Sequence, residues 1–492
     1  MKPSKNTKAG RILLALFIHI CLFFSETLSA SAEPDEAVDY LALAEERKSL
    51  EIQSNQIENW PAGPAIGAQA AILLEANTGI VLYAKNVDER LYPASTTKLM
   101  TCLVAVEHAS MDEMVSFSHD AVFSIEPGSS NMGIDENEAL PMEECLYGIM
   151  VGSANEVANA VAEHVAGSMD AFAGMMNEKA RGLGCTNTHF VNAHGLFDEN
   201  HYTSASDLAI IARAFFQNEL LSKIGNTASY HFEPTPTQPD DFVKRNKHKF
   251  ITGEIAYDGI KGGKTGYTDQ ARQTLVTCAE KKGMKLICVV LKEESPEQFN
   301  DTLKLLDYGF ANFAVTNVSE NETKYNISSA RFFQTSYDVF GNSQPILALN
   351  PNSYLILPKT VDFTDLTSEV SYGQTGKNQV VEIRYYYNNA YVGAATVDWA
   401  NRQPSAYSAP AESTLTAQDA QSNPAADGPS PEKVIFINVK TLLIAVLAVT
   451  AGLILLTILR DLLTSYNFLT RRKRRKKSGS LFKRSKDDGP TF

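Results

Sequence analysis

The pattern of apolar and polar residues predicts two β-hairpins, one at each end of a long helical stretch. Apolar side chains alternate with others over residues 70–74 and 80–84, and Asn77-Thr78-Gly79 lies between the two runs. An Asn and a Gly between alternating segments are typical of a hairpin turn. Residues 273–279 and 284–291 form a second such pair, joined by a turn that contains Gly283.

Between these hairpins the apolar residues recur at helical spacing. Within residues 95–108 the recurring positions are Leu99, Cys102, Leu103 and Val106. This period predicts a helix, and residues 142–165 predict two further helical pieces with a break near Gly152. Strands, many helices and then strands in this order favour an α+β fold, in which helices pack on a sheet.

Alternation returns in the last third of the chain, for example over residues 380–387, and predicts a small all-β domain over residues 315–400. Residues 60–312 then form the first domain. The preceding residues 33–59 are an acidic leader, either helical or loose. Residues 401–432 collect Pro, Ser, Ala, Gln and Asp with few large apolar groups, which is typical of an extended linker.

The first residues have the order of charge, apolar core and small residues that marks a secretory signal peptide. Basic residues precede an apolar run over residues 12–24, and Ala30-Ser31-Ala32 follows it. We expect cleavage of residues 1–32, so that the mature chain begins at Glu33. An uncleaved anchor is the alternative, but the run is short for a membrane span.

Residues 441–459 contain no charged side chain. At ~1.5 Å rise per residue they cover most of a ~30 Å hydrocarbon core, so we expect a single transmembrane helix. A buried core helix is the alternative, but a linker and a basic tail flank the segment. The tail, residues 460–492, includes the basic run Arg471 to Lys477. Positive charge beside a span places the tail in the cytoplasm and the domains outside.

Charge then excludes one class of partner. The formal charge is −13, and the part between the signal and the tail is more acidic still. This argues against nucleic acid as a partner, and it implies that local cations hold any anionic substrate. The cysteines left after signal removal are Cys102, Cys145, Cys185, Cys278 and Cys288. Their odd number and apolar contexts indicate core residues, and their spacing indicates neither a disulfide framework nor a metal site.

The candidate chemistry begins at Ser95 and Lys98, one helical turn apart and therefore on one face. A serine hydroxyl is a weak nucleophile until a base takes its proton, and a desolvated lysine near other cations is neutral enough to do so. Backbone N–H groups at a helix start also favour a developing oxyanion. By itself the S-x-x-K spacing is weak evidence, because residues 430–433 and 480–483 match it too.

Two further elements give the pattern its specificity. Ser153-Ala154-Asn155 lies at the predicted break between helices, and Lys264-Thr265-Gly266 lies at the start of a strand. S-x-x-K, S-x-N and K-T-G in this order are the signature of serine penicillin-recognising enzymes. Ser129-Ser130-Asn131 also fits S-x-N. We prefer Ser153 because a residue at a helix interruption can face a cleft.

With these motifs, residues 68–399 resemble the D-alanyl-D-alanine carboxypeptidases of the low-molecular-weight penicillin-binding proteins, peptidase family S11. The supporting segments are Tyr92-Pro93-Ala94-Ser95, Gly152-Ser153-Ala154-Asn155, Asn192-Ala193-His194-Gly195-Leu196, Tyr202 to Leu208 and Gly263 to Thr268. The resemblance implies a β-lactamase/transpeptidase-like catalytic domain followed by a small β domain. It also implies peptidoglycan stem peptides as substrates, β-lactam antibiotics as acylating inhibitors, and no cofactor.

The resemblance also assigns roles. Ser95 attacks the penultimate D-alanine carbonyl, and Lys98 is its base. Ser153 and Asn155 relay the proton and hold the peptide. Lys264 and Thr265, with Gly266 of the same motif, meet the terminal carboxylate. The backbone N–H groups of Ser95 and Tyr267 form the oxyanion hole.

Four other residues lie near these motifs, and the sequence does not place them among the reacting groups. Arg245 and Arg272 either assist with the carboxylate or are solvated surface charges. His194 and Asp207 fall in family-like segments, and we expect them to fix loops by hydrogen bonds.

Two features depart from the family. Arg272 stands where a glycine is usual, which predicts a different cleft wall. The C-terminal segment is apolar all round and not amphipathic, so it should span the membrane and not lie on its surface.

Two other functions compete with the carboxypeptidase. A β-lactamase shares the motifs, but no E-x-x-L-N segment lies between Asn155 and Lys264. A non-catalytic penicillin-binding scaffold is the second alternative, and the intact Ser95, Lys98 and K-T-G argue against it.

Overall fold

The computed structural model describes residues 38–325, 347–371 and 379–399, all of which belong to one compact unit, residues 1–405. The predicted signal peptide (1–32), linker (401–432), membrane span (441–459) and basic tail (460–492) lie outside the described residues. Across the three described ranges, no helix combines the length and the hydropathy that a membrane crossing requires.

The centre of the first domain is a five-stranded antiparallel sheet with the order β2-β1-β9-β8-β7. Its strands are β1 (Ala70–Glu75), β2 (Val81–Lys85), β7 (Ile260–Thr268), β8 (Arg272–Lys281) and β9 (Met284–Glu293). Both predicted hairpins are confirmed, as β1 pairs with β2 and β8 with β9. The two hairpins meet where β1 pairs with β9 along its whole length, so segments far apart in sequence form one sheet.

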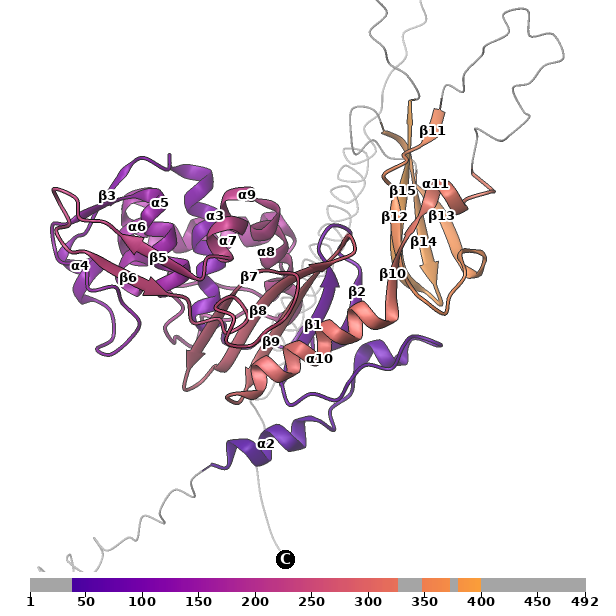
Figure 1. The fold of residues 1–492 in the computed structure, drawn as a ribbon, viewed down its shortest axis with the longest axis horizontal. Coiled ribbons are helices and arrows are strands. Elements are labelled where there is room, and N and C mark those ends of the chain that lie inside the picture. Colours follow the sequence, from indigo (N-terminus) through magenta and orange to yellow (C-terminus); the bar gives the residue numbers. More distant parts are fainter. Residues whose placement is uncertain (1–37, 326–346, 372–378, 400–492) are drawn as a thin grey trace, which may run out of the picture. The chain divides into compact units, whose positions relative to one another are not determined.

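Alternate side chains of this sheet enter two different cores. Ile72 and Val289 pack with the helical group that includes α3 (Lys98–His108) and α8 (Ala205–Gln217). Leu73 packs on the opposite face, against α10 (Glu297–Asn312). Figure 1 shows the strands between α10 and the helical group. The sheet is therefore the middle layer of the predicted α+β sandwich.

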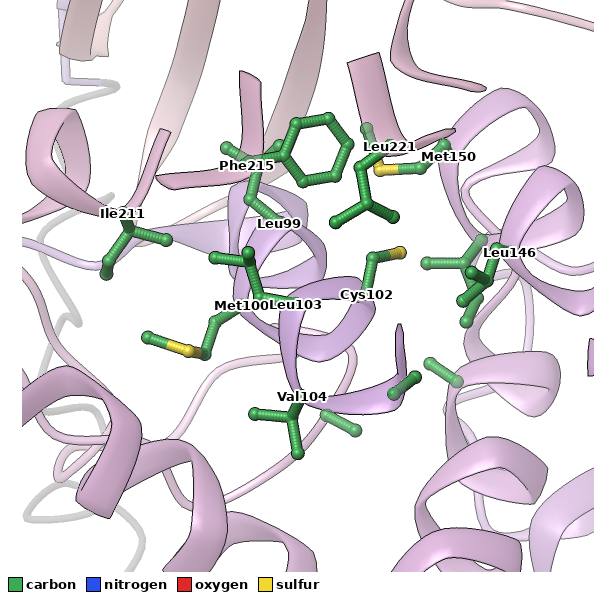
Figure 2. Packing of buried hydrophobic residues seen from close by; sticks show 14 of the residues in the cluster. Leu99, Met100, Cys102, Leu103, Val104, Leu146, Met150, Ile211, Phe215 and Leu221 are labelled. Carbon is green, nitrogen blue, oxygen red and sulfur yellow. The ribbon is translucent and has the colours of Figure 1, made fainter. Parts of the chain in front are cut away.

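Helix α3 runs through the centre of the helical core. Figure 2 shows Leu99, Cys102 and Leu103 among side chains from the surrounding helices. The predicted apolar face is confirmed, since these three side chains are buried. Truncation of a leucine in such a core costs about 2–5 kcal/mol of stability. The cysteines at 102, 145, 185, 278 and 288 are all free and buried, as core residues should be.

The predicted helical break near Gly152 is a π-helical turn, Gly148–Gly152, between α5 (Met142–Tyr147) and α6 (Asn155–Ala166). It ends at Ser153, whose φ of 60° lies in the left-handed region. The remaining elements of this part are α4 (His119–Phe123), α7 (Met169–Leu183), α9 (Glu219–Gly225), β3 (Met114–Ser116), β4 (Ala139–Pro141), β5 (Ser229–Phe232) and β6 (Phe242–Arg245).

The last third of the described chain is rich in strands, as the alternation predicts. Its elements are β10 (Phe313–Asn317), α11 (Val318–Asn321), β11 (Leu347–Leu349), β12 (Tyr354–Pro358), β13 (Thr367–Ser371), β14 (Gln379–Tyr387) and β15 (Ala390–Trp399). One sheet has the order β11-β15-β14-β13, and β10 pairs with β12. Asn388 and Asn389 both have positive φ and form the tight turn between β14 and β15.

The part of the acidic leader that the structure describes, residues 38–59, packs on the first domain. It contains α2 (Tyr40–Arg47) and a 3-10 turn, Gln53–Gln56. The Asp39 side chain caps α2 by accepting the N–H groups of Leu41 and Ala42. Arg47 at the other end is buried, with its Nε donating to Gly67 O at 2.7 Å. The helical alternative for this segment is therefore confirmed for residues 40–47.

Candidate active site

The candidate nucleophile lies on a tight turn that begins α3. Ser95 belongs to a 3-10 turn, Ala94–Thr97, and Lys98 is the first residue of α3. Ala94 has a φ of 49°, an unusual conformation for alanine. Gly195 presses on this turn, because a Cβ there would lie 1.9 Å from Ala94 O. On the other side, Thr274 Oγ1 donates to Pro93 O at 3.0 Å, so both sides fix the turn.

Lys98 has no exposed surface and makes three short hydrogen bonds. Its Nζ donates to Ser95 Oγ at 3.1 Å, to Asn155 Oδ1 at 2.6 Å and to His194 O at 2.7 Å. None of these acceptors is a carboxylate. Burial first, and then the neighbouring cations Lys264 and Lys247, lower the pKa of Lys98 well below its usual value. A neutral amine beside the hydroxyl is the state that a general base requires.

Ser153 and Asn155 are brought to the same place by the π-helical turn and the first turn of α6. Lys264 Nζ donates to Ser153 Oγ at 3.0 Å and to Thr265 O at 2.9 Å. Burial and then Lys247 lower the pKa of Lys264 to about 7. The two lysines therefore hold the two polar residues of the S-x-N motif.

The K-T-G segment lies on β7, the terminal strand of the sheet. A Cβ on Gly266 would lie 2.9 Å from Ser95 N and 2.3 Å from Thr274 Oγ1. Only glycine lets β7 approach the Ser95 turn this closely. Tyr267 follows in the same strand with a half-exposed side chain.

These elements surround a cleft of about 660 Å³. Of the sequence-predicted residues, its lining includes Ser95, Ser153, Asn155, Thr265, Gly266 and Tyr267. Lys98 and Lys264 lie directly behind this wall, joined to it by the hydrogen bonds above. The structure therefore brings all eight predicted site residues together from three separate segments.

The competing S-x-N segment also reaches the cleft. Ser129 and Ser130 line it, and Ser130 O accepts the N–H of Asn155 at 2.9 Å. The side-chain bonds from Lys98 and Lys264, however, go to Asn155 and Ser153. The geometry therefore favours residues 153–155 and gives residues 129–131 a supporting place.

The cations near the site differ from those that sequence proximity indicated. Arg245 is exposed and pairs with Glu254 at 3.1 Å, and Arg272 pairs with Glu294 at 2.7 Å. Neither arginine lines the cleft, whereas Lys247 does, with its Nζ donating to Ser130 Oγ at 2.6 Å. The sequence offered no signal for Lys247, since its spacing from K-T-G resembles that of Arg245.

The structural roles expected for His194 and Asp207 are confirmed. Asp207 accepts the N–H of Asn187 at 2.6 Å and the hydroxyl of Thr188 at 2.8 Å. Burial and then Lys98 lower the pKa of His194 to about 3. Its neutral Nδ1 accepts the N–H of Leu196 at 3.1 Å. Both residues therefore fix loops around the site.

The groups that the motif residues bring together are hydroxyls, amines and amides, and the carboxylates of Glu126 and Asp269 also line the cleft. In the part of the chain that the structure describes, no group of three or more His, Cys, Asp or Glu residues is placed to hold a metal ion. The arrangement can perform nucleophilic catalysis by an activated serine.

Residues 57–295 match the model of the family described as D-alanyl-D-alanine carboxypeptidase, peptidase S11. The D-alanyl-D-alanine carboxypeptidase DacF of Bacillus subtilis is 36% identical over 253 residues, covering 50% of this chain and 63% of the relative. DacA of Escherichia coli is 33% identical over 310 residues, covering 61% of this chain and 73% of the relative.

A solved structure is similar as well. Penicillin binding protein 5 from Haemophilus influenzae gives a TM-score of 0.56 at 26% identity, covering 69% of this chain and 98% of that one. The family match includes the positions of Ser95, Ser153 and Lys264.

Proposed function

The chain belongs to the peptidase S11 family of D-alanyl-D-alanine carboxypeptidases, and on this premise we propose that it removes the terminal D-alanine from peptidoglycan stem pentapeptides. The observation that carries the proposal is the 3.1 Å distance between Lys98 Nζ and Ser95 Oγ, across which the hydroxyl donates to the amine once the amine is neutral. The lysine is completely buried, and its other partners are an amide and a carbonyl oxygen.

In the first step, Ser95 Oγ attacks the carbonyl carbon of the penultimate D-alanine while Lys98 Nζ accepts the hydroxyl proton. The backbone N–H groups of Ser95 and Tyr267 donate to the developing oxyanion. The peptide C–N bond then breaks, and the leaving amine takes a proton from Lys98 through the Ser153 hydroxyl. D-Alanine departs and leaves an acyl ester on Ser95. Water hydrolyses this ester and restores the enzyme.

The substrate is held by the two walls of the cleft. Strand β7 ends the sheet, so its free edge is suited to pair with an extended peptide. Lys264 and Thr265, beside Gly266, meet the terminal carboxylate, and the Asn155 amide holds the peptide backbone. This local positive charge offsets the acidic character of the whole chain.

The β-lactamase alternative differs in how water reaches the ester. A β-lactamase dedicates a base to that water, whereas Lys98 and Ser153 are the groups that we assign to it here. The carboxylates of Glu126 and Asp269 also line the cleft, and we assign neither of them this role. An opened penicillin stays tethered where water must approach, while D-alanine leaves and clears the path. We therefore expect the penicilloyl ester to persist and the peptidyl ester to turn over.

The test is mass spectrometry of the purified ectodomain with a muropeptide pentapeptide and, separately, with penicillin. We expect one D-alanine released per pentapeptide and a penicilloyl adduct on Ser95 that lasts for minutes or longer. Ser95→Ala is the control and should lose both signals while keeping the fold. Rapid penicillin turnover without D-alanine release would identify a β-lactamase, and a stable adduct without release would identify a non-catalytic scaffold.

We also propose that residues 60–312 are the catalytic domain, that residues 315–400 are a small β-rich domain, and that residues 441–459 anchor the chain in the membrane. The anchor is supported by the sequence, through the uncharged segment and the basic run after it. Protease added to intact cells should remove the domains and spare a tag placed after Phe492. Loss of that tag would contradict the orientation.

A further inference from the structure

The acidic leader carries two side chains that reach the active-site end of the sheet. Tyr40 and Arg47 are the first and last residues of α2, about two helical turns apart, and so lie on one face. Ala44 lies between them on that face and is buried. Leu41, on another face, is 62% exposed. Helix α2 therefore docks on the domain through a single face.

A buried carboxylate, that of Glu294, lies between Arg47 at the end of α2 and Arg272 of strand β8. Glu294 is 3% exposed, and its Oε2 accepts from Arg272 Nε at 3.0 Å and from Arg272 Nη2 at 2.7 Å. Its Oε1 lies 3.6 Å from Arg47 Nη2. The Arg272 guanidinium also stacks on the Tyr40 ring, 3.7 Å from the ring centroid. Arg272 thus contacts Tyr40 of α2 and Glu294 at the same time.

Arg272 in turn borders the residue that follows K-T-G. It opposes Thr268 at the end of the β7–β8 hairpin. Its Nη1 lies 3.5 Å from Tyr267 Oη, and its guanidinium lies 5.8 Å from the centroid of the Tyr267 ring. The hairpin end that carries Tyr267 is therefore tied, through one guanidinium, to the leader.

The backbone of Arg272 indicates that its side chain is needed. Its φ of 52° is a left-handed conformation, which a glycine adopts without strain. A buried ion pair is also weak evidence for stability alone, because desolvation offsets much of the attraction. A guanidinium kept at a strained position by two partners is better explained by a role in orienting its neighbours.

We propose that Arg272 is a positioning residue for the carboxypeptidase reaction and that α2 is the strap that holds it, through Tyr40 and Glu294, against Tyr267. This inference rests on the proposed function, since it acts on the backbone N–H that Tyr267 contributes to the oxyanion hole. The strap aligns a transition-state donor without touching the substrate.

The experiment compares Tyr40→Ala with Tyr40→Phe, which keeps the stacking ring, and with Leu41→Ala on the exposed face. Loss of an oxyanion donor lowers kcat by about 10²–10³, so misplacing one should lower it by roughly five- to tenfold. We expect this loss in Tyr40→Ala, with KM changed by less than about twofold, because the contact acts on the transition state. Tyr40→Phe and Leu41→Ala should match the wild type.

Arg272→Gly separates positioning from stability. It relieves the left-handed backbone and so should fold well, yet it should show the same loss of kcat as Tyr40→Ala. Wild-type kcat in both Tyr40→Ala and Arg272→Gly would overturn the inference.

The rate of penicilloyl formation on Ser95 is measured for the same variants, because it uses the same oxyanion hole. If the wild type releases no D-alanine, the proposed function is contradicted. The rate of penicilloyl formation still tests whether Arg272 and Tyr40 position the oxyanion donor. A wild type that neither releases D-alanine nor forms the adduct would sink both.

Discussion

The cleft and the contact between α2 and the sheet both contain buried positive charge, but the partners of that charge differ. In the cleft, Lys98 and Lys264 face hydroxyl, amide and carbonyl oxygens. Beneath α2, Arg47 and Arg272 both face Glu294. Burial and neighbouring cations lower the pKa of each cleft lysine: Lys264 and Lys247 act on Lys98, and Lys247 acts on Lys264. The neutral form of each lysine therefore becomes accessible.

This difference separates a reactive group from an anchoring group. A buried cation opposite a carboxylate stays charged and holds its partner in place. A buried amine among neutral acceptors and other cations can release and take a proton near neutral pH. Residue type contributes as well, because a guanidinium keeps its charge where an amine does not.

A carboxylate partner for Lys98 should have the largest effect, because it gives the cleft lysine the environment of the paired arginines. Asn155→Asp places one at the Asn155 Oδ1 position, 2.6 Å from Lys98 Nζ in the wild type. It should raise the pKa of Lys98 and protonate the base. Since general-base catalysis contributes about 10²–10⁴-fold, we expect acylation at neutral pH to fall by at least about 100-fold.

The pH profile of Asn155→Asp checks the direction of the pKa shift of Lys98. Activity requires neutral Lys98 and is present above its pKa, so the acid limb of kcat/KM should move to higher pH. Asn155→Ala controls for loss of the amide and should lower the rate without that shift. An unshifted limb in Asn155→Asp would contradict the assignment of Lys98 as the base.

The two serine candidates test whether contact with the cleft lysines matters. Ser153→Ala removes the hydroxyl bound by Lys264 Nζ, and we expect a loss of about 100-fold in D-alanine release. Ser129→Ala is the matched control in the same cleft and should be close to neutral. Both rates are read from D-alanine release under single-turnover conditions. Reversed effects would show that residues 129–131 are the functional S-x-N motif.

Removing the shared carboxylate tests the paired cluster. Glu294→Ala leaves the buried Arg47 and the partly buried Arg272 without this partner, and we expect the free energy of unfolding to fall by about 3 kcal/mol. Glu254→Ala breaks the exposed pair with Arg245 and should change stability little. Urea titration of both variants measures the difference. Equal losses of unfolding free energy would mean that the Glu294 contacts stabilise the fold no more than the exposed pair does.

The smallest effect is expected from the cation next to the two cleft lysines. Lys247 is one cause of the lowered pKa of both Lys98 and Lys264. Lys247→Gln should therefore raise both pKa values and lower kcat/KM at pH 7 by roughly threefold. Lys249→Gln is the control, as Lys249 lines the same cleft without being such a cause. An equal shift of the acid limb in both variants would contradict this role for Lys247.

Short-range patterns in the sequence determined much of this protein. The alternation around residues 70–84 and 273–291 identified both hairpins, and the helical period after Ser95 identified α3. The spacing of Ser95 and Lys98 identified the reactive pair, since residues one turn apart meet wherever the helix forms. Such features depend on local backbone geometry and so are visible in a single sequence.

Tertiary structure alone decided which polar residues meet. The bond from Lys98 to Asn155 joins residues 57 apart in sequence, and that from Lys264 to Ser153 joins residues 111 apart. The same packing placed Lys247 at the cleft and turned Arg272 to Glu294 and the leader. No local period encodes these contacts, because each depends on how the sheet and the helices pack against one another.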